Sequence, residues 1–148
     1  MAKYGVWLFA LLGWGACTAP TSTEGVVAST TVNSDSLNTY LADHPNHTAS
    51  LNLRARRYME QSNLPYALAD AQAVLELDST DHDAWLVVGE VQYLTNHSRE
   101  ARDAWERCFV EHPTETACRL KLAELYSMVM EYDKSLDLVD KVIELDPK

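Results

Sequence analysis

Histidine and cysteine are the residue types in this chain with the most potential for chemistry, and their spacing limits that potential. The five histidines are His44, His47, His82, His97 and His112. Only His44 and His47 lie close together in sequence, and a structural zinc ion takes four ligands. The sequence contains no phosphate-binding loop, nucleophile elbow or metalloprotease motif. We therefore expect histidines exposed in turns, with no metal, no cofactor and no catalysis.

Two of the three cysteines, Cys108 and Cys118, lie on successive predicted helices across a short turn. Outside the cytoplasm such a pair forms a disulfide if the two Cα atoms lie within about 7 Å. The alternative is a pair of buried free thiols, which behave as small apolar side chains. The sequence leaves both states open.

The N-terminal segment is typical of a secretory signal. Lys3 precedes an apolar run over residues 4–14, and small residues follow it up to Cys17. A helix that spans a bilayer needs roughly 20 apolar residues, so this run is too short. We expect residues 1–16 to direct export.

The end of this signal resembles the lipobox of bacterial lipoproteins at Gly15, Ala16 and Cys17. Trp14 departs from the pattern, because a leucine is usual at that place. The resemblance implies that Cys17 becomes the lipidated first residue of the mature chain. Simple secretion and an uncleaved anchor are the alternatives.

Residues 18–33 are rich in threonine and serine and carry one charge, Glu24. Such a composition buries too little apolar surface to fold. We expect residues 17–33 to form a lipidated cysteine followed by a flexible tether. A glycosylated stalk is the alternative.

The remainder of the chain repeats every 34 residues. Pro45, Ser79, Pro113 and Pro147 share this spacing, as do the small residues Ala55, Gly89 and Ala123, and Ala67, Ala101 and Ser135. A period of this length is typical of a solenoid of helix–turn–helix units. The pattern predicts helices at about 34–43, 49–61, 64–77, 82–94, 98–111, 116–129 and 132–145.

The repeat resembles the tetratricopeptide repeat (TPR) family. Its pattern W-x2-L-G-x2-Y, A-x3-F, P is matched in the middle repeat by Trp85, Gly89, Ala101 and Pro113. In the third repeat, Arg119 stands in place of the tryptophan. The resemblance covers residues 48–147. It implies an all-α TPR solenoid of three repeats plus an N-terminal half repeat, within a domain 34–148.

In TPR proteins the first helix of each repeat lines a concave groove. Carried onto this chain, the resemblance assigns the groove to Asn52, Arg56, Met59, Leu86, Glu90, Tyr93, Leu94, Leu120, Glu124 and Met128. Several are large and apolar where solvent is expected, and exposed apolar patches rimmed by charge usually bind a partner. Ordinary surface scatter is the alternative. Glu90 and Glu124 favour a ligand that carries lysine or arginine.

The last predicted helix, 132–145, has no helix after it to cover Leu136, Val139 and Val142. Terminal repeats of solenoids normally need a polar cap. Three explanations are compatible with this sequence: a natural chain that is longer, self-association through this end, and tolerated exposure.

The chain has 148 residues, 22 of them acidic and 12 basic, and a net charge of −10. An acidic protein lacks the basic face that nucleic acids require. We predict a non-enzymatic adaptor of the bacterial cell envelope that binds an extended peptide or helix in its groove. Thr18 after the lipidated cysteine favours the outer membrane, facing the periplasm. A self-assembling scaffold and a truncated regulatory domain of a longer protein are the alternatives.

Overall fold

The computed structural model describes residues 34–145, and all regular secondary structure in this range is helical. The helices are α1 (Ser34–Asp43), α2 (Thr48–Glu60), α3 (Leu64–Leu77), α4 (His82–Leu94), α5 (Ser98–Glu111), α6 (Thr116–Met128) and α7 (Tyr132–Leu145). The predicted bounds 49–61 and 116–129 are each off by one residue at one or both ends, and the others agree. The predicted signal, Cys17 and the tether lie outside the described residues.

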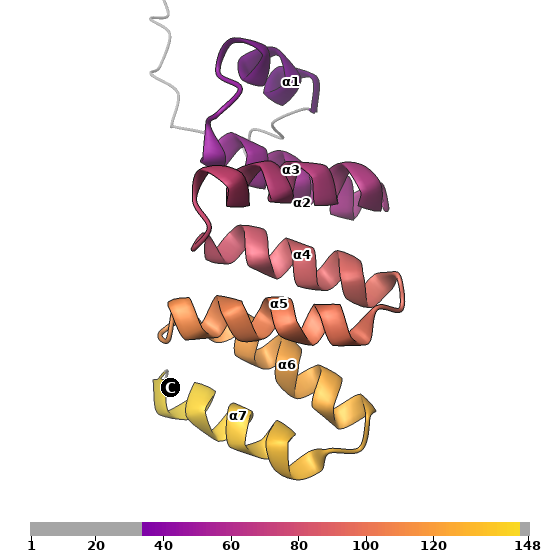
Figure 1. Ribbon diagram of the computed structural model, residues 1–148, viewed down its shortest axis with the longest axis vertical. Helices are drawn as coiled ribbons and strands as arrows, with labels where there is room; N and C mark the ends of the chain where they lie inside the picture. The colour runs from indigo at the N-terminus through magenta and orange to yellow at the C-terminus, as the bar shows by residue number, and fades with distance from the viewer. Residues whose placement is uncertain (1–33, 146–148) are drawn as a thin grey trace, which may run out of the picture. The chain divides into compact units, whose positions relative to one another are not determined.

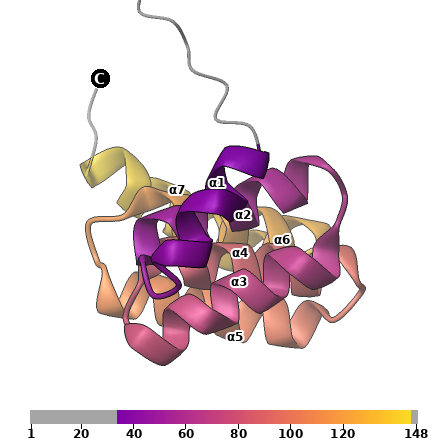
Figure 2. The same cartoon turned by 90° about the horizontal axis from the view of Figure 1, so that it is seen from above.

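Successive helices pack antiparallel, and each contacts mainly the helices before and after it in the chain. Figure 1 shows them running back and forth in order from α1 to α7, with α2 and α3, α4 and α5, and α6 and α7 forming the closest pairs. Figure 2 shows the same helices from above. This arrangement confirms the predicted all-α fold of helix–turn–helix repeats.

Small residues let the two helices of each repeat approach closely. Ala55 and Ala67 are fully buried between α2 and α3. In the third repeat the Ser135 hydroxyl donates to the Ala123 carbonyl over 2.8 Å. The small side chains that recur with the 34-residue period therefore mark the helix–helix contacts, as predicted.

The turn within each repeat uses a left-handed residue. Ser62, Asn96 and Met130 have φ angles of 58°, 66° and 63°. In each turn the next amide donates back to a carbonyl in the last turn of the first helix, as in Asn63 N–H to Tyr58 O over 2.8 Å. These are Schellman motifs built without glycine. The turn geometry thus repeats with the same 34-residue period as the sequence.

The turn between the first and second repeats is held by aspartates. Asp78 accepts hydrogen bonds from the hydroxyl (2.7 Å) and the backbone N–H (2.9 Å) of Thr80. These bonds hold the pKa of Asp78 below its ordinary value. Asp81 accepts the Ala84 N–H over 2.8 Å and so caps the start of α4.

Two apolar clusters form the core. The first runs from Leu41 to Val91 and the second from Ala101 to Leu138, with Trp105 as the largest fully enclosed side chain. On α1, Leu37 and Leu41 are buried, whereas Tyr40 is exposed and its ring stacks on that of His44 with the centroids 4.4 Å apart.

The final helix is only partly covered. Leu138 packs into the second core cluster, whereas Leu136 is 60% exposed. Val139 and Val142 are half-buried. The expectation of partial exposure for these three apolar side chains on α7 is therefore met most fully by Leu136.

Candidate binding groove

Two cavities lie side by side along α2 and α4, and we call them together the α2–α4 groove. One, of about 520 Å³, is lined by Arg56, Met59, Glu60, Leu86, Val87, Glu90 and Leu94. The other, of about 390 Å³, is lined by Thr48, Ala49, Asn52, Leu53, Arg56, Asp81 and Asp83. Six of the ten predicted groove residues therefore line this surface: Asn52, Arg56, Met59, Leu86, Glu90 and Leu94.

Asn52 sits deeper than a residue facing a ligand usually does. Its side chain is buried, with the whole residue only 6% exposed. The side-chain amide donates to Asp81 Oδ1 over 3.0 Å, so Asn52 ties α2 to the carboxylate that caps α4. Its own carbonyl oxygen is buried without a hydrogen-bond partner in the described part of the chain. Asn52 is in the first place a link between repeats.

Charged groups at this groove are paired more than the sequence suggested. Arg56 forms an ion pair with Asp83 across the gap between α2 and α4. Lys121, which the sequence analysis did not single out, places its Nζ 3.3 Å from Glu90 and 3.9 Å from Glu124. Both predicted acidic groove residues therefore share one lysine. The spacing of Lys121 and Glu124, three apart on a helix, was a usable signal for half of this arrangement.

The predicted residues on α6, which are Leu120, Glu124 and Met128, line neither of the two cavities. Leu120 and Met128 are exposed, as is Leu94 on α4. Tyr93 is half-buried: its hydroxyl lies 2.6 Å from Met128 Sδ, and its ring is 5.9 Å from that of Trp105. Tyr93 thus bridges α4 and α6 and is less open to solvent than expected.

The neighbouring arginines do not form a free basic surface. Arg54 makes a two-pronged ion pair with Asp70, Nε to Oδ2 over 2.7 Å and Nη2 to Oδ1 over 2.8 Å. Its remaining nitrogen donates to Asn38 on α1. The hydrogen bond with Asp70 raises the pKa of Arg54. Arg57 pairs with Glu60 one turn along α2.

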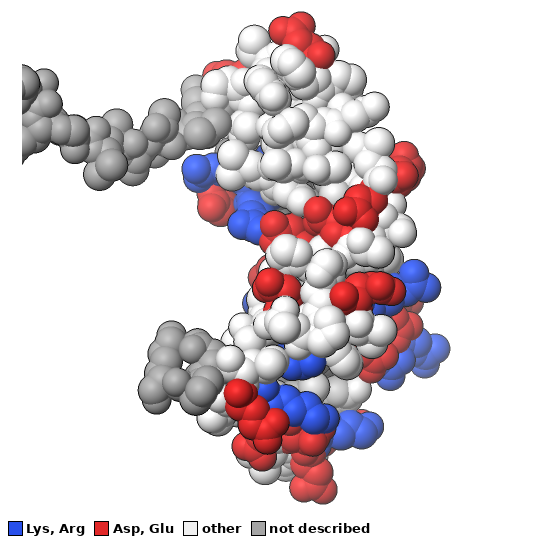
Figure 3. All heavy atoms as spheres, turned by 90° about the vertical axis from the view of Figure 1, so that its left-hand side faces the viewer, with Lys and Arg blue, Asp and Glu red and all other residues white. Residues whose placement is uncertain are grey.

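Acidic and basic side chains are distributed unevenly over the face shown in Figure 3. The acidic side chains gather in a band across the middle, whereas lysine and arginine lie mainly toward the edges and the lower part. Acidic residues outnumber basic ones among the charged residues that line the α2–α4 groove, because Arg56 is accompanied by Glu60, Asp81, Asp83 and Glu90.

Cys108 on α5 and Cys118 on α6 are brought together by the turn between these helices. Their Cα atoms are 6.1 Å apart and their sulfur atoms are joined in a disulfide. Both residues are fully buried in the second core cluster. The bond closes the turn that connects the second repeat to the third.

The five histidines lie in or next to the segments that connect the helices. His47 caps α2, because its Nδ1 accepts the Ser50 N–H over 3.2 Å. The rings of His82, the first residue of α4, and His112, the C-cap of α5, lie 5.2 Å apart. Both residues are half-buried because they pack against each other, and the prediction of exposed turn histidines is wrong for these two. Within residues 34–145 no three His, Cys, Asp or Glu side chains are grouped so as to hold a metal ion.

Sequence comparison matches the chain to no known protein family and to no curated protein. Solved structures do resemble it. A crystal structure of MamA aligns with a TM-score of 0.66 and 22% identity over 77% of this chain and 67% of that one. MamA 41-end from Desulfovibrio magneticus RS-1 aligns with a TM-score of 0.67 and 17% identity over 77% of this chain and 64% of that one.

The fold is TPR-like, as in MamA. At identities of 17% and 22% the likeness concerns the arrangement of helices alone. The chain spans 64–67% of the length of these two MamA chains. None of the helices within residues 34–145 combines the length and apolar character needed to cross a bilayer.

Proposed function

We propose that this chain is a non-enzymatic adaptor that holds an extended peptide or a helix of a partner protein against the α2–α4 groove. The observation that carries the proposal is the larger groove cavity, about 520 Å³, where Met59, Leu86 and Leu94 face the same space from two helices. A TPR-like stack presents such a surface on rigid elements, and apolar side chains at helical spacing suit a peptide or helix partner.

The partner chemistry follows from the groove charge. Carboxylates outnumber arginine around the two cavities, and Arg56 is already paired with Asp83. Lys121 offsets part of the charge of Glu90 and Glu124. We therefore propose a partner segment with apolar anchors flanked by lysine or arginine, and no nucleic acid.

We further propose that the adaptor is held by lipid at Cys17 on the outer membrane of a bacterial cell envelope, facing the periplasm. Support comes from the lipobox-like sequence around Cys17. The buried disulfide between Cys108 and Cys118 is the kind of bond that persists in oxidising compartments. Replacing Cys17 by serine should release the protein from membranes on fractionation, and continued membrane pelleting would contradict the lipid anchor.

The groove is tested by placing charge on its apolar surface. Leu94 is exposed and lines the larger groove cavity, so Leu94→Glu should leave the fold intact and reduce capture of partner proteins by crosslinking. Val110→Glu is the matched control, because Val110 is 63% exposed on α5 and lines neither groove cavity. Unchanged capture by Leu94→Glu, with correct folding, would remove the groove proposal.

A self-assembling scaffold is the second candidate, favoured by apolar side chains exposed on α7. Leu136 and Ile143 are exposed there, and Met128, Met130 and Tyr132 are exposed around the preceding turn. Apolar patches of this kind often lie at interfaces between copies. Light-scattering mass across a range of concentrations distinguishes the candidates: a dimer that dissociates on dilution favours the scaffold, and a constant monomer favours the adaptor.

A further inference from the structure

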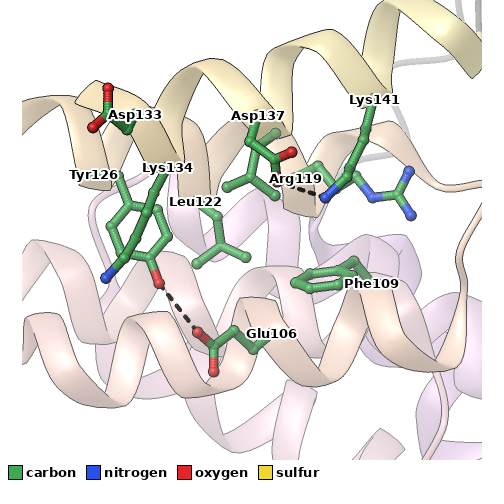
Figure 4. A pocket seen from close by; sticks show the side chains of 10 residues that line it. Glu106, Phe109, Arg119, Leu122, Tyr126, Asp133, Lys134, Asp137 and Lys141 are labelled. Carbon is green, nitrogen blue, oxygen red and sulfur yellow. Dashed lines mark hydrogen bonds and ion pairs between the residues drawn. The ribbon is translucent and has the colours of Figure 1, made fainter. Parts of the chain in front are cut away.

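A further cavity in the described part of the chain lies outside the α2–α4 groove. It encloses about 600 Å³ between α5, α6 and α7. Phe109, Leu122 and Leu138 give it an apolar floor, and charged side chains surround them (Figure 4). The volume is within the range of small-ligand sites, about 300–1,000 Å³.

Arg119 is the cation of this cavity without an acidic partner. Its guanidinium lies over the Phe109 ring, 5.6 Å from the centroid. The Nε atom is buried and has no hydrogen-bond partner among the described residues. No carboxylate of residues 34–145 forms an ion pair with it. A buried donor without a partner is costly, so a small movement of the side chain that brings this N–H to an acceptor in the cavity would be favourable.

Most other charges around the cavity are already engaged. Lys141 Nζ lies 2.5 Å from Asp137, and Lys134 pairs with Glu131. The carboxylate of Glu106 accepts the Tyr126 hydroxyl over 3.3 Å. Figure 4 shows Arg119 and Lys141 together near Phe109, with Glu106 and Asp133 toward the other end. The cavity therefore has a cationic end beside an apolar floor.

The repeat explains how this end arises. Arg119 occupies the place that Trp85 holds one repeat earlier. The Trp85 indole donates to Ser79 O over 2.8 Å, and its ring is covered by Arg107. In the third repeat the indole is replaced by a guanidinium, and Lys141 takes the place of Arg107. A half-buried aromatic side chain in the second repeat is thus replaced in the third by a cation that lines a cavity.

We propose that this cavity binds a carboxylate attached to an apolar body, either a free organic acid or the C-terminal residue of a peptide. The carboxylate pairs with Arg119 and shares Lys141 with Asp137, and the apolar body lies on Leu122, Leu138 and Phe109. A guanidinium binds a carboxylate with two parallel hydrogen bonds, which makes arginine the suitable residue for this role.

The test titrates the full chain with 4-phenylbutyrate and with the neutral 4-phenylbutanamide, followed by methyl NMR. We expect saturable binding of the acid, with shifts at Leu122 and Leu138 and none at Leu86 and Leu94. The amide should bind about tenfold more weakly, since it loses a charge-assisted hydrogen bond. Arg119→Gln should weaken binding of the acid by a similar factor. Arg99→Gln, at an exposed position at the start of α5, should leave binding of the acid unchanged.

A short peptide that ends in phenylalanine, compared with its C-terminal amide, identifies the source of the carboxylate. Binding of 4-phenylbutyrate, of the peptide with a free C-terminal carboxylate, or of both supports the site and tells which ligand it takes. Binding of neither overturns it, as does acid binding that Arg119→Gln leaves unchanged. Arg119→Lys guards against a folding defect, because it keeps the charge and should bind at intermediate strength. Leu94→Glu should leave carboxylate binding at this cavity unaffected. A failure of the carboxylate-site proposal can therefore be told apart from a failure of the groove proposal.

Discussion

The indole of Trp105 lies directly against the backbone of Gly89. A Cβ atom built on Gly89 would stand 2.2 Å from Trp105 Nε1 and 2.4 Å from Cδ1. The same Nε1 donates to Leu86 O over 3.3 Å, which fixes the ring across α4. The glycine of the TPR-like pattern is therefore required here by the close approach of a neighbouring helix, since its own backbone is ordinary α-helix.

Gly89→Ala should accordingly destabilise the protein. In an open helix this change is stabilising by up to about 1 kcal/mol, but overpacking against Trp105 should reverse the sign and cost about 1–3 kcal/mol. Urea denaturation measures the difference. Adding Trp105→Leu should remove much of the penalty of the alanine, and a strictly additive double variant would argue against the contact.

Met130→Gly should stabilise the turn between α6 and α7. Met130 holds a φ of 63°, a conformation that costs a residue with a side chain about 1–2 kcal/mol. After the extra chain entropy of glycine, a net gain of about 0.5–1 kcal/mol remains. Val129→Gly is the control, because Val129 has a φ of −88° and should gain nothing. Equal effects at both positions would disprove the turn argument.

Replacing Arg54 alone should lower the stability of the protein more than replacing Arg54 and Asp70 together. Asp70 is nearly buried, and Arg54→Met leaves its carboxylate without the two-pronged partner. Since the pair retains some solvent contact, we expect a loss of about 2–3 kcal/mol, below that of fully buried pairs. The double variant Arg54→Met with Asp70→Leu should recover most of this loss in thermal unfolding. No recovery would show that Arg54 acts through packing alone.

Reduction of the Cys108–Cys118 disulfide should lower stability without unfolding the chain. The bond closes a loop with a sequence separation of 10 residues, for which chain entropy gives about 2–3 kcal/mol. The melting temperature should fall on addition of a phosphine reductant, and Cys108→Ser with Cys118→Ser should melt at the reduced value with no further response. If the melting temperature of the wild-type protein does not change when the reductant is added, the two cysteines are not paired in solution.

Asp78 should make stability depend on acidity. The Thr80 hydroxyl lowers the pKa of Asp78 in the folded state, so its stabilising effect is present above the ordinary carboxyl pKa, near 4, and is lost as the pH falls through the lowered value. The difference in stability between wild type and Asp78→Ala should shrink over that acidic range. Thr80→Val should show the same trend in weaker form. Asp140→Ala, at an exposed position on α7, serves as the reference.

The order and bounds of the helices could be predicted from the sequence because their determinants are local or strictly periodic. Ala55 and Ala123 recur with the period of the repeat, so each marks a helix contact without knowledge of the neighbouring repeat. The turn geometry at Ser62, Asn96 and Met130 follows the same period, although none of these positions is a glycine that would have indicated a left-handed conformation in the sequence.

The pairing of charges depended on tertiary structure, because it joins residues of different repeats. Lys121 reaches Glu90 across 31 positions, and Asn52 reaches Asp81 across 29. Such contacts depend on how far one helix pair is displaced over the next and on which rotamers then meet. Six of the predicted groove residues line the cavities along α2 and α4, whereas Asn52 is buried and Tyr93 is half-buried, which the sequence did not predict.

The sequence by itself determined the repeat, the helices and the small residues at the contacts between helices. These features follow from residue types at a fixed spacing, which are visible without knowing how the helices pack. Only the tertiary structure decided which charges remain without a partner. Arg119 was visible in the sequence as a departure from the repeat pattern. That it stands over Phe109 at the edge of a cavity, with no carboxylate of the described chain to neutralise it, follows from the packing of α5, α6 and α7.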